Sequence, residues 1–329
     1  MRSAWCATGF CVLLGSAVAA TAATLPNPVT GYPDRPIRWI IDFPSGGLSD
    51  ILARLVGQKV SDALGQPIVI DARPGANGTI AYALGARANA DGYTLVFLST
   101  PFSLNVSIYD KLGYDTRNDF APVSLISAYP NLLVTHLKVP VKTVPDLIAY
   151  AKGRSEGLTY ASPGIGSSGH LAMELLRRLQ SFKAVHVPYS GSVPALNDMM
   201  GGRTDAMFVN MPAAMTHVRA NRMRVLAIAA PARSTILPEV PTFVEAGVPG
   251  FYAVGYTGVA VPAKTPANIV AKLNAEFVRA LGMPDVRERI ESLGGEPRSS
   301  TPGEFRRFLT DEIARWAPII RDSGAKAER

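Results

Sequence analysis

Cysteine is nearly absent from this sequence of 329 residues. Cys6 and Cys11 are its only two cysteines, and both lie in an apolar segment at the start of the chain. Arg2 gives this segment a positive start, and small residues at its end form two A-x-A cleavage patterns, which is typical of a secretory signal peptide. We expect residues 1–23 to be removed on export. The mature chain would then have no disulfide, thiol nucleophile or cysteine metal site.

Other absences exclude further classes of protein. The four histidines are not spaced as metal ligands, so we expect no metal site. The net charge of +7 is spread along the chain without a run of five basic residues, which argues against a nucleic-acid partner. Beyond the N-terminal segment, no apolar run approaches the roughly 18 residues that a membrane-spanning helix needs.

The most informative stretch that is present is residues 43–50, F-P-S-G-G-L-S-D. It lies between a strand-like run at 37–41 and an amphipathic helical pattern at 51–64. Gly46 and Gly47 allow a ligand to approach the backbone closely, and the oxygens of Ser49 and Asp50 are of the kind that cap a helix start. Because a helix N-terminus presents unpaired N–H groups and a partial positive charge, this turn is predicted to hold a carboxylate.

A second glycine-rich stretch, at residues 162–170, also follows a strand and opens a helix. Its three glycines formally satisfy G-x-G-x-x-G, but no acidic residue follows before Asp198, so a dinucleotide cofactor is disfavoured. Two interpretations remain: a flexible loop with a serine cap, or a second anion site that uses Ser167 and Ser168. The similarity of the two turns favours the second. His170 at this helix start is predicted to be structural.

Strands and helices alternate in two series along the chain, which predicts parallel sheets with helices on their faces. Residues 99–119 are predicted to be irregular, and residues 123–127 and 132–135 to form two strands. Capping boxes are predicted at Thr143 and at Thr301. The chain is expected to cross between two lobes, with hinges near 127–131 and 253–257. Residues 30–127 and 254–329 would form the first lobe, and 128–253 the second.

The ordered motifs of the chain resemble those of the Bug family, the extracytoplasmic solute receptors of tripartite tricarboxylate transporters. The resemblance covers nearly all of the mature chain. Besides residues 43–50, it is carried by Tyr32-Pro33, Asn77-Gly78-Thr79, Asp91-Gly92-Tyr93-Thr94, Asp119-Phe120-Ala121-Pro122-Val123, Gly164-Ile165-Gly166-Ser167-Ser168-Gly169-His170-Leu171, His186-Val187-Pro188-Tyr189, Asp205-Ala206-Met207-Phe208 and Val240-Pro241-Thr242.

This resemblance implies an α/β, two-lobed periplasmic binding protein of the Venus-flytrap, type II-like kind, in which each lobe is a mostly parallel sheet flanked by helices. Such a receptor is not an enzyme. It captures a small organic acid in the interlobe cleft and delivers it to integral membrane transporter subunits, and we expect it to be a monomer without a cofactor. The predicted ligand-binding residues are Phe43, Gly46, Gly47, Leu48, Ser49, Asp50, Ser99, Thr100, Gly166, Ser167, Ser168, Gly169, His170, Tyr189 and Asn210.

Two positions depart from the pattern of the family. Asp42 stands where the family often has proline or another neutral residue, and Leu48 stands where it often has a small residue. We therefore expect a carboxylate whose remainder is uncharged, cationic or apolar, although the sequence does not identify it. The alternatives are a sensing receptor that signals to a membrane partner and an exported hydrolase using Ser167 or Ser168. The hydrolase is disfavoured because G-x-S-x-G is absent.

Overall fold

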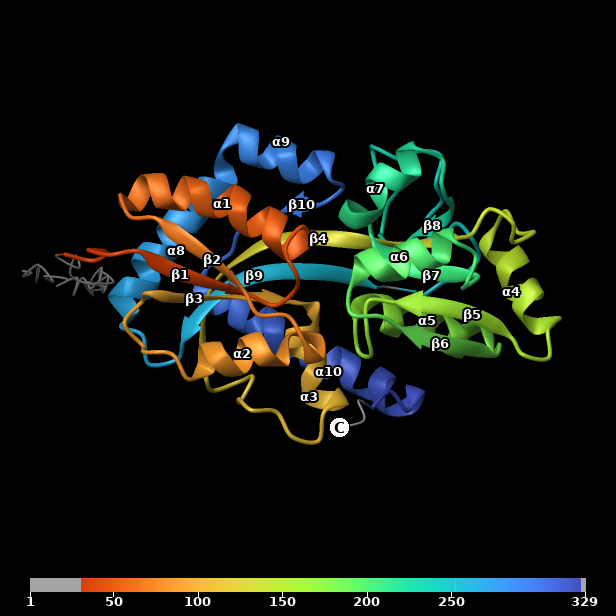
Figure 1. Ribbon diagram of the computed structural model, residues 1–329, viewed down its shortest axis with the longest axis horizontal. Helices are drawn as coiled ribbons and strands as arrows, with labels where there is room; N and C mark the ends of the chain where they lie inside the picture. The colour runs from red at the N-terminus through yellow and green to blue at the C-terminus, as the bar shows by residue number, and fades with distance from the viewer. Residues whose placement is uncertain (1–30, 252, 327–329) are drawn as a thin grey trace, which may run out of the picture.

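The structure of the protein, a computed structural model, describes residues 31–251 and 253–326, so the predicted signal peptide lies outside the described residues. The chain forms two lobes that lie side by side, joined by long strands that run from one to the other (Figure 1).

The first lobe is built on three parallel strands in the order β2-β1-β3, with β9 antiparallel to β3. Helices α1, α2, α8 and α9 surround this sheet (Figure 1). The elements are β1 (Ile37–Ile41), α1 (Leu48–Leu64), β2 (Ile68–Ala72), η1 (Ala76–Gly78), α2 (Thr79–Ala86), β3 (Thr94–Ser99), α3 (Thr100–Ile108), β9 (Val254–Pro262), α8 (Ala267–Gly282), α9 (Pro284–Ser292) and β10 (Glu296–Pro297).

The second lobe repeats this plan with the parallel strands β7-β5-β6, and helices again lie against its sheet (Figure 1). Its elements are α4 (Val144–Lys152), β5 (Leu158–Ser162), α5 (Ser168–Gln180), β6 (Ala184–Pro188), α6 (Ser192–Met200), β7 (Ala206–Asn210), α7 (Met211–Arg219) and β8 (Arg224–Ile228). The sheet is buried because helices cover it, which explains the apolar composition of strands such as β7, AMFVN.

Two elements belong to both lobes. Strand β4 (Phe120–Thr135) pairs with β9 along its first part and with β7 and β8 along its last part. Helix α10 (Pro302–Ser323) buries Phe305 in a core cluster of the first lobe and Trp316 in one of the second. Arg178 of α5 pairs with Asp322 of α10 at 2.7 Å, so the end of α10 is also fastened to the second lobe by charge.

Most predicted elements are present, and two predictions are corrected. The predicted strands at 123–127 and 132–135 are parts of the single strand β4, since Tyr129 and Pro130 remain paired with β9. The stretch 99–119, predicted to be irregular, contains α3, which starts at Thr100 with Pro101 in its first turn. Both predicted capping boxes are confirmed, at Thr143 with Asp146 and at Thr301 with Glu304.

Within the described residues, no helix combines the length and the apolar character that a membrane crossing would require.

Candidate ligand-binding site

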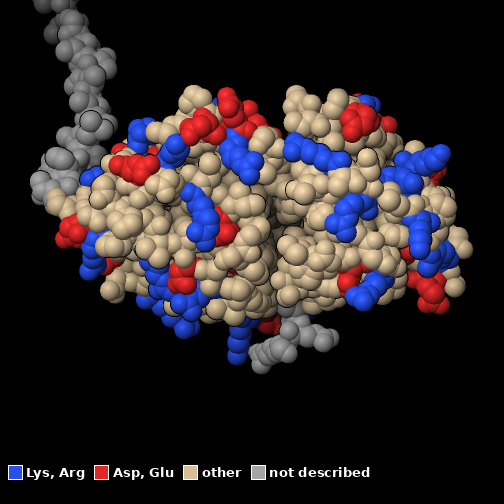
Figure 2. Space-filling model, turned by 45° about the horizontal axis from the view of Figure 1, so that its top comes forward, with Lys and Arg blue, Asp and Glu red and all other residues tan. Residues whose placement is uncertain are grey.

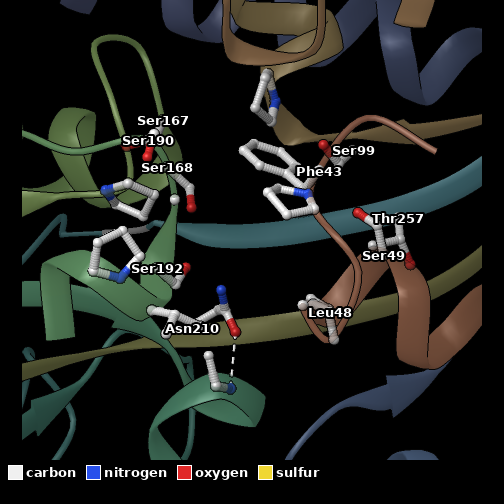
Figure 3. A pocket seen from close by; sticks show the side chains of 18 of the residues that line it. Phe43, Leu48, Ser49, Ser99, Ser167, Ser168, Ser190, Ser192, Asn210 and Thr257 are labelled. Carbon is white, nitrogen blue, oxygen red and sulfur yellow. Dashed lines mark hydrogen bonds between the residues drawn. The ribbon is translucent and has the colours of Figure 1, made fainter. Parts of the chain in front are cut away.

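A cavity of about 320 Å³ lies between the two lobes, at the ends of the parallel strands. On the molecular surface the junction of the lobes is visible as a furrow (Figure 2). Phe43, Leu48 and Ser99 line one side of the cavity, and serines of the second lobe line the other (Figure 3). The complete lining is Phe43, Pro44, Ser45, Gly47, Leu48, Ser49, Ser99, Pro101, Tyr129, Pro163, Ser167, Ser168, Ser190, Gly191, Ser192, Val193, Pro194, Asn210, Ala213 and Thr257.

Five helices begin at this cavity, because five strands end there and each is followed by a helix, either directly or after a short loop. The N-cap residues of α1, α3, α5, α6 and α7 all line it; they are Gly47, Ser99, Ser167, Gly191 and Asn210. Each helix start carries unpaired N–H groups and a partial positive charge. None of the described residues in the lining has a charged side chain, so the backbone N–H groups of the helix starts are an important source of positive potential in the cavity.

The turn of the first loop, residues 43–50, is held by a carboxylate that lies outside the cavity lining. Gly46 has a φ of +83°, and its N–H donates to Oδ2 of Asp50 at 3.0 Å. Oδ1 of Asp50 accepts from Nε of Arg54 at 2.9 Å. Asp50 therefore fixes the shape of the turn from inside helix α1, and Gly47 and Leu48 are left to face the ligand space.

A second carboxylate, Asp42, lies directly behind this loop and is completely buried. Its Oδ1 accepts from Ser49 Oγ at 2.7 Å, and its Oδ2 accepts from Tyr82 OH at 2.6 Å and from the hydroxyl of Ser99. Burial raises the pKa of Asp42, and these three hydrogen bonds oppose the rise. Ser49 and Ser99 thus connect a buried acid to the wall of the cavity.

The second loop, residues 162–170, is supported by imidazoles. The Gly166 N–H donates to Nδ1 of His170 at 3.0 Å, and the His170 ring stacks on the His186 ring with centroids 4.0 Å apart. Nε2 of His186 lies 2.6 Å from Ser162 Oγ. Burial lowers the pKa of His170 to about 4 and that of His186 to about 3, so both rings are neutral at neutral pH.

Two cavity residues of the second lobe use an oxygen to cap their own helix. Ser167 Oγ accepts from the His170 N–H at 3.3 Å, and Asn210 Oδ1 accepts from the Ala213 N–H at 3.0 Å. In Figure 3 the dashed line marks the second of these bonds, and the amide nitrogen of Asn210 points into the cavity. The hydroxyl hydrogen of Ser167 and the amide hydrogens of Asn210 therefore stay available for a ligand.

Comparison with known proteins identifies the family. The sequence model of a protein family, the tripartite tricarboxylate transporter family receptor (TctC), matches residues 52–325. The chain belongs to this family. Protein BugT of Bordetella pertussis (strain Tohama I) is 37% identical to this receptor over 322 residues, which is 97% of this chain and 98% of BugT. The predicted family resemblance is confirmed, and members of the family are periplasmic receptors.

Solved structures of related proteins share the two-lobed fold. A structure of an R. palustris protein with adipate matches the receptor with a TM-score of 0.87 and 36% identity, covering 90% of this chain and 100% of the other. MatC from Rhodopseudomonas palustris with bound malate matches with a TM-score of 0.82 and 35% identity, covering 88% of this chain and 100% of MatC. The predicted fold class is confirmed.

The predicted site residues of the receptor fall into two groups. Those that line the cavity are Phe43, Gly47, Leu48, Ser49, Ser99, Ser167, Ser168 and Asn210. Those outside the lining are Gly46, Asp50, Thr100, Gly166, Gly169, His170 and Tyr189. The second group supports the loops or neighbouring elements: Thr100 Oγ1 accepts from the Tyr256 N–H at 3.0 Å, and Tyr189 OH donates to Asp198 at 2.9 Å.

Several residues of the lining were not predicted from the sequence. Besides Pro44 and Ser45 inside the first loop, they are Pro101, Tyr129, Pro163, Ser190, Gly191, Ser192, Val193, Pro194, Ala213 and Thr257. Residues 190–194 follow a strand and open a helix, so the strand–turn–helix pattern could have identified them. Tyr129 and Thr257 come from the crossing strands β4 and β9, where only the strand register decides which side chain faces the cavity.

Proposed function

We propose that this receptor captures a small organic acid in the interlobe cavity, holds it by a carboxylate and delivers it to a tripartite tricarboxylate-type membrane transporter. The observation that carries this proposal is the convergence of five helix N-termini on a cavity whose described lining has no charged side chain. Such a cavity attracts an anion through backbone N–H groups and hydroxyls.

The magnitudes are sufficient for useful affinity. A hydrogen bond to a charged group contributes about 1.5–3 kcal/mol, and a helix N-terminus adds about 0.3–1 kcal/mol. A micromolar complex needs only about 8 kcal/mol in total. Ser167, Asn210 and the helix starts at residues 168 and 192 would therefore suffice as carboxylate donors, with the ordering cost subtracted.

The related structures support a carboxylate ligand, since one of them contains adipate and another contains malate. We also propose that the receptor is a monomer, that it reaches the periplasm by cleavage of residues 1–23, and that it has no catalytic activity. The described serine that pairs with an imidazole is Ser162, which is completely buried and outside the lining. That arrangement gives the hydrolase alternative no exposed, activated nucleophile.

Calorimetry of the mature chain with a panel of mono- and dicarboxylic acids tests the proposal. We expect a single site of submillimolar or better affinity for at least one acid. Gly47→Leu places a side chain in the cavity and should abolish binding, whereas Gly282→Leu, an exposed position at the end of α8, should bind like wild type. Full affinity in Gly47→Leu, or no binding of any acid by the wild type, contradicts the proposal.

A further inference from the structure

We propose that Asp42 makes the serine side chains of the first-lobe wall hydrogen-bond acceptors, so that the receptor prefers an acid whose far end carries an N–H or O–H donor. Amide, amine and hydroxyl groups have such donors, and a second carboxylate has none. This inference rests on the proposed function and specifies the class of acid that the same site selects.

The hydroxyl hydrogens of the two serines in this wall are used in hydrogen bonds to Asp42. Ser49 and Ser99 both line the cavity, and both donate to the carboxylate of Asp42 behind them. A serine hydroxyl has one hydrogen and two lone pairs. Once the hydrogen points at Asp42, each serine offers only lone pairs to the ligand.

Tyr82 OH and Ser99 Oγ also lie 3.3 Å apart, but Oδ2 of Asp42 is nearer to each hydroxyl and is therefore the better-placed acceptor for both hydrogens. The third donor to Asp42 is the hydroxyl of Tyr82, a completely buried side chain of α2. The three donors come from α1, α2 and the end of β3, so they surround the carboxylate with neutral groups. A ligand carboxylate placed against the hydroxyls of Ser49 and Ser99 would face their lone pairs and, behind them, another acid.

The opposite wall has the reverse polarity. Ser167 and Asn210 accept from their own helices and keep hydrogens for the cavity. The polarity of the two walls therefore orients a bound acid, with its carboxylate toward the second lobe and its donor group toward Ser49 and Ser99. Asp42 does not touch the ligand in this arrangement; it is a positioning residue that acts through the two serines.

Matched pairs of ligands test this inference directly. The probes are succinate and adipate, each compared by calorimetry with its own half-amide, which replaces one carboxylate by an uncharged group with two N–H donors. We expect wild type to bind the half-amide roughly tenfold more tightly or better in at least one pair. Tighter binding of the diacids, equal binding within both pairs, or binding confined to acids without a donor at the far end overturns the inference.

The variant Asp42→Asn tests whether the preference for the half-amide depends on Asp42. The amide of asparagine donates to one of the surrounding hydroxyl oxygens, so the hydrogen of that hydroxyl is released. The ratio of half-amide to diacid affinity should fall by roughly tenfold. Asp62→Asn, an exposed position on the same helix α1, is the matched control and should keep the wild-type ratio. A wild-type ratio in folded Asp42→Asn overturns the role of Asp42.

Ser99→Ala provides a second test of the inference that can be used if Asp42→Asn does not fold. It removes one acceptor from the wall and should weaken binding of the half-amide while leaving the diacid nearly unchanged; equal weakening of both overturns the inference. These outcomes are distinguishable from failure of the proposed function, in which wild type binds neither the half-amides nor any acid of the wider panel.

Discussion

The two loops that face each other across the cavity have the same backbone design and different supports. Each follows a parallel strand, turns at a glycine with positive φ and opens a helix. Behind the first loop lie the carboxylates Asp42 and Asp50, and behind the second lie the imidazoles of His170 and His186. The shared backbone gives both loops affinity for an anion, and the buried groups decide what the side chains can donate or accept.

The glycines of the two loops also serve different purposes. Gly47 has an extended backbone and borders the cavity. Gly169 lies where α5 packs on β7, and a Cβ there would be 2.3 Å from the backbone oxygen of Phe208. A Cβ on Gly166 would be 2.1 Å from Ile108 in α3, so the second loop also contacts the first lobe directly. In the first loop, Gly47 lets a ligand approach the backbone. In the second loop, Gly166 and Gly169 allow close packing against neighbouring elements.

Alanine substitutions at Gly169 and Gly47 should show the largest difference between the two loops, measured as the loss in free energy of unfolding. Gly169→Ala should lower the free energy of unfolding by about 3 kcal/mol, because the clash is with backbone and α5 must move away from β7. Gly47→Ala should cost less than about 1 kcal/mol, since its Cβ lies 3.2 Å from the Pro44 oxygen. Urea denaturation of both variants and wild type measures the difference; equal losses would refute it.

The sequence predicted those features of the site that depend on local pattern. A glycine turn between a strand and an amphipathic helix identified residues 43–50 and 162–170, and both loops reach the cavity. The two capping boxes were equally predictable, because a cap and its partner lie three residues apart. Ser49 and Asp50 do not act as the N-cap of α1, which begins after Gly47 without a side-chain cap. Helix α3 was missed although Pro101 in its first turn was a usable signal.

Features that depend on distant parts of the chain could not be predicted. The sequence placed Asp42 beside the first turn but did not show its three donors, because they come from α1, α2 and β3. Tyr129 and Thr257 reach the cavity through the register of β4 with β9. His170 lies outside the cavity lining, and its stacking on His186 requires β5, β6 and α5 to be assembled.

Asn210 tests the donor character of the second wall. Asn210→Asp keeps an oxygen that caps α7, so stability should change little. It replaces the amide donor with a charged acceptor, and affinity for a carboxylate should fall roughly 100-fold, because a hydrogen bond is lost and like charges meet. Calorimetry with the best ligand of the panel measures this.

Asn221→Asp controls for the added charge, since it places the same change at an exposed position of the same lobe. A similar loss of affinity in both variants would indicate a general electrostatic effect instead of a lost donor. Retained affinity in Asn210→Asp would show that the carboxylate lies elsewhere in the cavity.

Acidification should change the stabilising contributions of the groups behind the two loops in opposite directions. Burial holds the pKa of His170 at about 4, below its ordinary value of 6.5, so on acidification the unfolded chain takes up this proton first. The stabilising contribution of the neutral ring is lost as pH falls from about 6.5 toward 4, and it amounts to about 2 kcal/mol between pH 7 and pH 5. The raised pKa of Asp42 works the other way, because its protonation favours the folded state.

Urea unfolding of wild type and His170→Gln at pH 7 and pH 5 measures how much His170 contributes to the pH dependence of the free energy of unfolding. The variant should lose about 2 kcal/mol less than wild type between the two pH values, because it has no buried imidazole at that position to protonate on unfolding. An unchanged acid dependence in His170→Gln would mean that the second loop is not held by a neutral imidazole, and the contrast between the two supports would fail.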